Sequence, residues 1–185
     1  MSFLKSLARI CGENNSPGIK GRIYLAEVCD IDTFPPTVLQ SEPASTDPLA
    51  EITMSAAITM VASKTFKYFD IILDSGKLQA EKIGERGSAA SSNKLPFRIV
   101  GSRPRQMAAY AQLIKWEGVG VVEMNAGAER FIIGTKARPA WVTTANMDSG
   151  DALTAANGTE YTIQADDALP WLYYPSGLAL AIDPG

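Results

Sequence analysis

The sequence predicts a mainly β (α+β) fold, in which two packed antiparallel sheets form a sandwich or barrel-like core with one flanking α-helix and long extended loops and arms. Most apolar runs are short, rich in strand-forming residues and bounded by turn residues. Only one segment carries apolar residues at helical spacing. With 46% hydrophobic side chains among 185 residues, the chain is long enough to bury one core. We therefore expect an N-terminal arm (1–21) and a single β domain (22–185).

The first half of this domain consists of strand-like runs separated by turns. Residues 22–28 are rich in strand formers and lie between Gly21 and Asp30. Residues 30–48 follow as a long loop, because prolines in this number cannot join a strand ladder. The next strand-like runs are expected to form a meander; they are 51–60, 66–73, 77–85 and 88–100.

A helix is predicted over residues 103–117. Ser102 is a candidate N-cap, and Pro104 lies in the first turn, where a missing N–H costs nothing. Gly118 is expected to end the helix. An apolar stripe at helical spacing should pack on a sheet; its residues are Met107, Tyr110, Ala111 and Ile114.

The second half of the domain begins with a predicted hairpin of residues 120–125 and 131–134. Residues 137–144 contain Pro139, so we expect either an edge strand or a strand that begins at a bulge. Residues 159–165 show the cleanest alternation in the chain. The tail is apolar enough to need a covering surface; its apolar runs are 170–175 and 178–182.

The composition argues against several kinds of chemistry. The chain has no histidine, which removes Ser-His-Asp, Cys-His and zinc–histidine sites. Cys11 and Cys29 fit neither a disulfide framework nor a four-ligand zinc site, and we expect both to be buried free thiols. The 17 basic and 20 acidic residues nearly cancel, which disfavours tight nucleic-acid binding. We expect no catalytic residue, no metal and no cofactor.

Acidic residues and glycines gather in residues 146–158, which could form a calcium loop, an anion cradle or a turn. After Asp148 the ligand positions of a calcium loop fall on glycine, alanine and threonine, and no lysine is present to hold a phosphate. We therefore expect a connection between two strands, with Asn157-Gly158 supplying a positive-φ turn. Other neighbouring carboxylates are expected to be solvated; they are Asp166 with Asp167 and Glu81 with Glu85.

Four aromatic residues could build a sugar-binding platform, but their flanking prolines and apolar neighbours favour a role in the core or in a subunit contact. They are Trp141, Trp171, Tyr173 and Tyr174. The apolar run at the N-terminus is broken too often for a signal peptide, and no window is long enough for a transmembrane helix. We expect a chain that is made in the cytoplasm and remains soluble there.

The order of the predicted elements is a glycine-rich lead, a first strand that ends in an Asp pair, a proline-rich loop, a meander, one helix, a hairpin and a final strand. The residues that carry this pattern are 18–26, 30–32, 131–134, 148–150, 157–159 and 161–163. In this order, over most of its length, the chain resembles the tail tube proteins of tailed phages, particularly those of Bacteroidota phages.

The resemblance implies a non-enzymatic virion protein, with the fold shared by the tube proteins of type VI secretion and contractile injection systems. Such subunits form hexameric rings, and the rings stack into a hollow tube through which the genome passes. The implied partners are further copies of the chain, other phage tail proteins, and viral DNA that moves through the lumen without specific binding, with no membrane. The implied location is the virion tail, assembled in the host bacterial cytoplasm.

The resemblance also assigns ring-to-ring contacts to the N-terminal lead and to the loop 30–48. The candidate subunit-interface residues are Ile31, Phe34, Pro35, Pro36, Val38, Leu39, Trp171, Tyr173 and Tyr174. The alternatives are a tail terminator, head–tail joining or minor capsid protein, and, from a different class, a carbohydrate-binding β-sandwich module.

Overall fold

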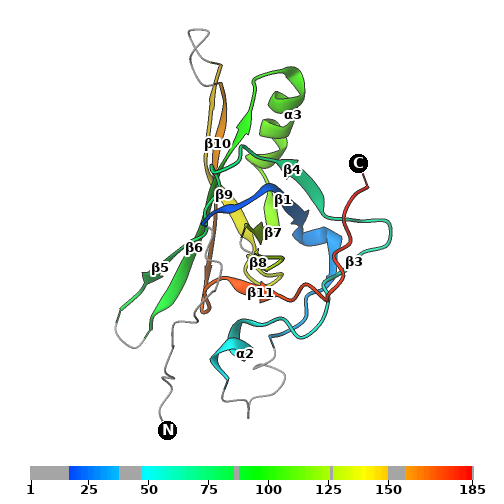
Figure 1. Cartoon of the computed structure of the whole chain (residues 1–185), viewed down its shortest axis with the longest axis vertical. Coiled ribbons are helices and arrows are strands. Elements are labelled where there is room, and N and C mark those ends of the chain that lie inside the picture. Colours follow the sequence, from blue (N-terminus) through cyan, green and yellow to red (C-terminus); the bar gives the residue numbers. More distant parts are fainter. Residues whose placement is uncertain (1–16, 38–46, 86–87, 126, 150–156, 185) are drawn as a thin grey trace.

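The computed structural model describes residues 17–37, 47–85, 88–125, 127–149 and 157–184 (Figure 1). The fold is mainly β, as the sequence predicts, with a large antiparallel sheet of nine strands and a small sheet of two strands. The described residues also contain two α-helices. The large sheet does not close into a barrel. It bends into two layers that pack face to face, so the predicted sandwich is the form that the core takes.

The first layer, which we call the β7 layer, surrounds the most buried strand of the chain. β7 pairs with β1 along one side and with β8 along the other, β1 pairs with β4, and β8 pairs with β11. The strands of this layer are β1 (Ile19–Glu27), β4 (Lys67–Asp70), β7 (Glu117–Met124), β8 (Arg130–Ile133) and β11 (Leu172–Tyr174).

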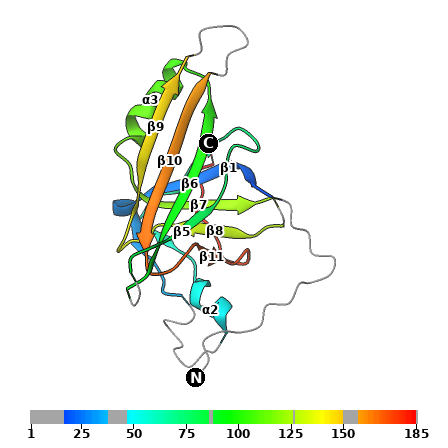
Figure 2. The same ribbon diagram turned by 90° about the vertical axis from the view of Figure 1, so that its left-hand side faces the viewer.

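The second layer, which we call the β10 layer, has the order β9-β10-β6-β5 and crosses the β7 layer steeply (Figures 1 and 2). The two layers join at one corner, where Glu117 and Gly118 of β7 pair with Trp141 and Ala140 of β9. The strands of this layer are β9 (Ala140–Asp148), β10 (Gly158–Asp167), β6 (Ala90–Val100) and β5 (Gln79–Ile83).

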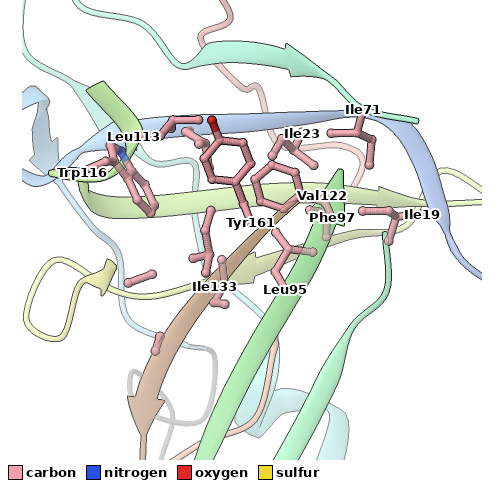
Figure 3. Packing of buried hydrophobic residues seen from close by; sticks show 14 of the residues in the cluster. Ile19, Ile23, Ile71, Leu95, Phe97, Leu113, Trp116, Val122, Ile133 and Tyr161 are labelled. Carbon is pink, nitrogen blue, oxygen red and sulfur yellow. The ribbon is translucent and has the colours of Figure 1, made fainter. Parts of the chain in front are cut away.

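The main core lies between the two layers (Figure 3). Phe97 of β6 and Tyr161 of β10 stack with their ring centroids 5.3 Å apart. Opposite them, Ile23, Val122 and Ile133 of the β7 layer are fully buried. Residues 159–165 alternate between apolar and polar side chains because one face of β10 packs on this core and the other face does not.

A second core covers the opposite face of the β7 layer. Val119 and Val121 of β7 pack there against Phe66, Met54 and Tyr174. The covering segments include a 3-10 turn (Val28–Asp30), the small sheet of β2 (Ile31–Thr33) and β3 (Thr59–Met60), and the helix α2 (Pro48–Ile52). Because both faces of β7 are buried, its sequence is apolar at consecutive positions and does not alternate.

The apolar tail finds its cover in this second core. Leu172 and Tyr174 are buried, and the Tyr174 hydroxyl donates to the Ala179 carbonyl at 2.6 Å. The tail then runs beside β4, where Ile182 bridges Phe66 in parallel. The exposed apolar surface that the tail sequence would create is therefore removed within the chain itself.

The prediction of a meander over residues 51–100 is wrong, because only β5 and β6 in this region pair with each other. β3 pairs with β2, and β4 pairs with β1. The predicted strand over 51–60 is also wrong for most of its length, since α2 takes Glu51 and Ile52 and β3 (Thr59–Met60) is the only named strand in this fully described segment. The Asp47 carboxylate accepts a hydrogen bond from Leu49 N at 3.1 Å, and Pro48 opens the helix, so a local Asp-Pro start signal decides this segment.

The predicted helix is present but shorter than expected. α3 spans Pro104–Leu113, and Glu117 already belongs to β7. Pro104 opens α3 as predicted, but Arg103 is its N-cap, in place of Ser102, and makes no side-chain capping bond. Its buried face agrees with the prediction only at Tyr110. Tyr110 and Leu113 pack on the main core, whereas Met107 and Ile114 of the predicted stripe are exposed.

The predicted loop 30–48 is wrong in part, since β2 (Ile31–Thr33) pairs with β3 and α2 begins at Pro48. Ile31–Thr33 precede the first proline of this segment, so they are free to join a ladder. The first strand also begins earlier than predicted, at Ile19 inside the predicted arm 1–21.

The predictions for the hairpin, for Pro139 and for the acidic segment agree with the structure. β7 and β8 form the expected hairpin, with Glu123 opposite Arg130. β9 begins immediately after Pro139, where a missing N–H breaks no ladder bond. β9 and β10 pair antiparallel on either side of the acidic segment, and Gly158 has φ 150° at the start of β10, so this segment connects two strands. Gly150 within it lies outside the described residues.

Candidate assembly surfaces

The subunit-interface candidates occupy three kinds of position. Ile31, Trp171 and Tyr174 lie inside the subunit with at most 7% of their surface exposed, so the chain's own core accounts for them. Pro35 is buried, Phe34 and Tyr173 are half-buried, and Pro36 is exposed. Val38 and Leu39 lie outside the described residues. Among the described candidates, only Phe34, Pro36 and Tyr173 offer side-chain surface to another molecule.

The structure brings Phe34, Pro35 and Pro36 to the wall of a cavity of about 560 Å³. Met54, Leu169 and Leu172 add further apolar surface to it, and the cations Lys136 and Arg138 line it as well. The Lys136 ammonium is held in place by a 2.6 Å hydrogen bond to the Asp32 carbonyl. Sequence reasoning missed this juxtaposition, because the loop after β8 and the proline-rich segment are about one hundred residues apart, as the Lys136–Asp32 separation of 104 residues illustrates.

A larger surface is the face of the β10 layer that points away from the core. Leu95 and Phe97 of β6 and Tyr161 and Ile163 of β10 point inward, so their neighbours in sequence point to this face. Neither α3 nor the β7 layer covers it, and it is turned toward the viewer in Figure 2. Its charged residues are Glu81, Lys94, Arg98, Asp148, Glu160 and Asp166.

The edges of the β10 layer are the second notable feature. β5 pairs with β6 on one side, and no described strand pairs with its other side. At the opposite edge, β9 pairs with β7 only at Ala140 and Trp141, so the rest of its outer side carries no described strand. Unpaired strand edges expose N–H and C=O groups that can hydrogen-bond with another strand.

The four aromatic residues do not form a common platform. Trp171 and Tyr174 are buried, and Tyr173 packs against Phe131 with ring centroids 5.8 Å apart. Trp141 is 37% exposed and lies on β9. This arrangement places most of the aromatic surface in intramolecular packing, which agrees with the expected role in the core.

The carboxylate pairs of the sequence do not converge on a common point either. Glu81 is paired with Lys94 across β5 and β6, with Oε2 and Nζ 2.7 Å apart, and Asp166 accepts from the Gln164 amide. Within the described part of the chain, no group of three or more His, Cys, Asp or Glu side chains is arranged to hold a metal ion. The described helices also include none long and apolar enough to cross a membrane.

Cys29 is exposed, so the prediction that it is buried is wrong; Cys11 lies outside the described residues. The short 3-10 turn that follows β1 turns its side chain outward. A hydrogen bond to the Glu27 carboxylate, local desolvation and the charge of Asp30 raise the pKa of the Cys29 thiol. The reactive thiolate is therefore disfavoured at this position.

Comparisons with known proteins give no match: no family model, no curated protein and no solved structure is significantly similar to this chain.

Proposed function

We propose that this chain is a non-enzymatic structural protein of a phage virion that self-assembles into hexameric rings, which stack into the tail tube through which the genome is ejected. The observation that best supports this proposal is the β10 layer, a long sheet with an uncovered polar face and an unpaired edge at β5. A sheet of this form can extend from one subunit to the next by strand pairing. The N–H and C=O groups of its free edges then form strand-to-strand hydrogen bonds only in the assembly.

In the proposed ring, β5 of one subunit lies beside the outer side of β9 in the next, near the point where the Tyr110 hydroxyl of α3 donates to the Ala145 carbonyl. This contact is heterologous, because two different edges meet, and a heterologous contact that closes produces a ring. The uncovered faces of successive β10 layers then form one continuous surface that lines the lumen.

The charges of this face suit a conduit for DNA. Its acids, Glu81, Asp148, Glu160 and Asp166, outnumber its bases, Lys94 and Arg98. A net negative wall repels phosphate groups weakly and offers no patch of cations to hold the backbone. Viral DNA passes such a wall without specific binding. The assembled tube resides in the virion tail and is built in the host bacterial cytoplasm, with other tail proteins at its ends.

Electron microscopy of the purified full chain in negative stain tests the proposal. We expect rings or stacked rings, and, by light scattering, particles whose smallest stable mass is that of a hexamer of the 19.8 kDa chain. A protein that stays monomeric at high concentration and is retarded in a polysaccharide gel would contradict the proposal and favour a carbohydrate-binding module. Single rings that never stack would favour a terminator or head–tail joining protein.

A further inference from the structure

The outward face of α3 carries apolar side chains that nothing in the described chain covers. Met107 is 53% exposed and Ile114 is 44% exposed. With the exposed Ala111 between them, they follow the helical spacing of i, i+4 and i+7 and form one stripe. The face that packs on the main core includes Tyr110 and Leu113 and lies beside this stripe. A stripe of this kind on the solvent side of a helix marks a surface for a partner.

Two cations lie at the ends of this stripe, Arg103 four residues before Met107 and Lys115 directly after Ile114. Arg105 lies two residues before Met107 and therefore projects from another side of the helix. Arg103, Arg105 and Lys115 are exposed, and none of them forms an ion pair with another described residue. Arg103 and Arg105 lie at the start of α3, where the helix dipole favours a negative side chain. The first turn therefore keeps cations at a position that is unfavourable for the helix itself. An acidic partner would compensate this cost.

The chain contains an acidic surface of matching character at α2. Leu49 is 54% exposed there, and it is flanked by the exposed carboxylates of Asp47 and Glu51. Glu51 forms no ion pair with any described residue. This surface belongs to a wider segregation of charge along the sequence. Residues 23–63 include acids but no lysine or arginine, whereas residues 86–116 include lysine and arginine but no acid.

The two surfaces cannot meet within one subunit. Figures 1 and 2 place α3 and α2 toward opposite ends of the long axis of the molecule, with the two sheet layers between them. An apolar, basic surface at one end and an apolar, acidic surface at the other end are complementary only between different copies of the chain. Contacts of this head-to-tail kind propagate along the axis that joins the two ends.

We infer that the outward face of α3 binds the α2 surface of a second copy of this chain, with Leu49 packed near the stripe of Met107 and Ile114, and Glu51 near Lys115. This inference rests on the proposed function and deepens it, because it assigns the contact between successive rings to these two surfaces. The free edges of the β10 layer serve contacts within a ring, while α2 and α3 serve contacts along the tube.

A cysteine cross-linking experiment tests the contact directly. In a Cys11→Ser, Cys29→Ser background, the full chain carrying both Leu49→Cys and Met107→Cys is treated with a short bismaleimide. We expect a ladder of covalent multimers on a denaturing gel, since each copy donates one end and accepts the other. Chains with Leu49→Cys alone or Met107→Cys alone serve as controls and are expected to remain monomeric.

The outcomes separate the inference from the proposed function. If the double variant stays monomeric on the gel while microscopy still shows tubes, the inference is overturned and the proposed function stands. If a ladder forms but neither rings nor tubes are seen, the contact is supported and the tube proposal fails. Covalent dimers of the Met107→Cys chain alone would mean that α3 meets α3, which overturns the inference.

Charge reversal provides a second test. Lys115→Glu, or Glu51→Lys, should raise the protein concentration needed for tube formation roughly tenfold, because like charges would then face each other. Lys115 is exposed and has no ion pair with a described residue, so Lys115→Glu should change the melting temperature little. Combining the reversals at both ends should restore assembly.

Glu129→Lys is the matched control, since Glu129 is exposed, has no ion pair with a described residue and lies on the hairpin of β7 and β8, outside both surfaces and outside the edges of the β10 layer. Reversal at either end with no more effect than this control would overturn the inference, as would a loss of assembly that the combined variant does not restore.

Discussion

At the scale of single residues, Glu123 links three strands of the β7 layer. It lies on β7 and accepts from Lys20 of β1 at 3.0 Å and from Arg130 of β8 at 2.9 Å. Arg130 also donates to the Leu178 carbonyl in the tail at 3.3 Å. Partial burial raises the pKa of Glu123, but the hydrogen bonds from Arg130 and Lys20 outweigh it, so the pKa is lowered below its ordinary value of 4.5. The charged form of this carboxylate is thus the form that links the strands.

Glu123→Gln should lower the free energy of unfolding by about 1–2 kcal/mol at pH 7, because the variant keeps the shape of the side chain but loses its charge. A group with a lowered pKa in the folded state stabilises the fold above its unfolded pKa, and this stabilisation disappears as the pH falls through the folded pKa. The difference between the two proteins should therefore shrink as the pH falls below about 4.5. Urea unfolding of dilute protein at several pH values measures it.

Glu129→Gln is the control for this comparison, since Glu129 is exposed on the same hairpin and has no ion pair with a described residue. A Glu123→Gln deficit that is the same at pH 7 and pH 3.5 would show that its charge is not the cause.

Gly118 decides how closely β1 and β7 approach at the corner where the two layers join. A Cβ atom at this position would lie 1.8 Å from the Ala26 carbonyl oxygen and 2.9 Å from the Trp116 ring. The first of these contacts involves backbone, which cannot move aside without shifting β1. The need for glycine here comes from packing between strands, whereas the sequence suggests only a helix end.

Gly118→Ala should destabilise the subunit by about 3 kcal/mol, near the upper end of the usual cost of overpacking. Gly177→Ala is the matched control, because a Cβ atom there meets nothing within 4 Å, and it should change stability by less than about 0.5 kcal/mol. Thermal and urea unfolding measure both. Equal stability of the two variants would mean that the close approach of β1 and β7 relaxes without cost.

At the scale of elements, α3 illustrates why a pattern fixes the type of an element more firmly than its orientation. Its apolar residues spread around much of the helix, since Tyr110 and Leu113 lie on one side and Met107 and Ile114 on another. Spacing alone cannot choose between these faces. The core makes the choice, because Tyr110 packs near Tyr161 with ring centroids 6.3 Å apart.

The free edges of the β10 layer lead to a prediction about neighbouring subunits. In the Cys11→Ser, Cys29→Ser background, Ala80→Cys on β5 and Thr143→Cys on β9 place thiols on two exposed strand edges. Within a closed ring, a bismaleimide should link each subunit to the next, and the denaturing-gel ladder should stop at six copies. A ladder with no upper limit would indicate an open helical array, and an unlinked chain in intact rings would mean that other edges meet.

At the scale of the whole molecule, the two kinds of surface lie in different directions. The edges of β5 and β9 flank the β10 layer, whereas α2 and α3 lie toward the two ends of the long axis (Figure 1). A subunit with lateral strand edges and complementary ends has what a stacked ring requires, namely one contact that closes and one that propagates. The two cores on the two faces of the β7 layer hold both sets of surfaces in place.

Much of the fold follows from local sequence, and much of the candidate site does not. The hairpin of β7 and β8, the strand β10 and the helix that starts at Pro104 each depend on neighbours in the chain, so period and turn residues are sufficient to predict them. Ile31 and Tyr174 were reasonable interface candidates as apolar residues in a loop and a tail. Their burial depends on the β7 layer, which no local pattern reveals.

The sequence by itself determined the fold class, the types of most elements and the absence of histidine chemistry, because composition and periodicity act over a few residues. Only the tertiary structure decided which strand β4 pairs with, that Cys29 is exposed, which face of α3 is left for a partner, and that the acidic and basic segments lie toward opposite ends. The physical reason is that burial and pairing join segments far apart in the chain, as the bridge between Thr53 and Tyr173 does.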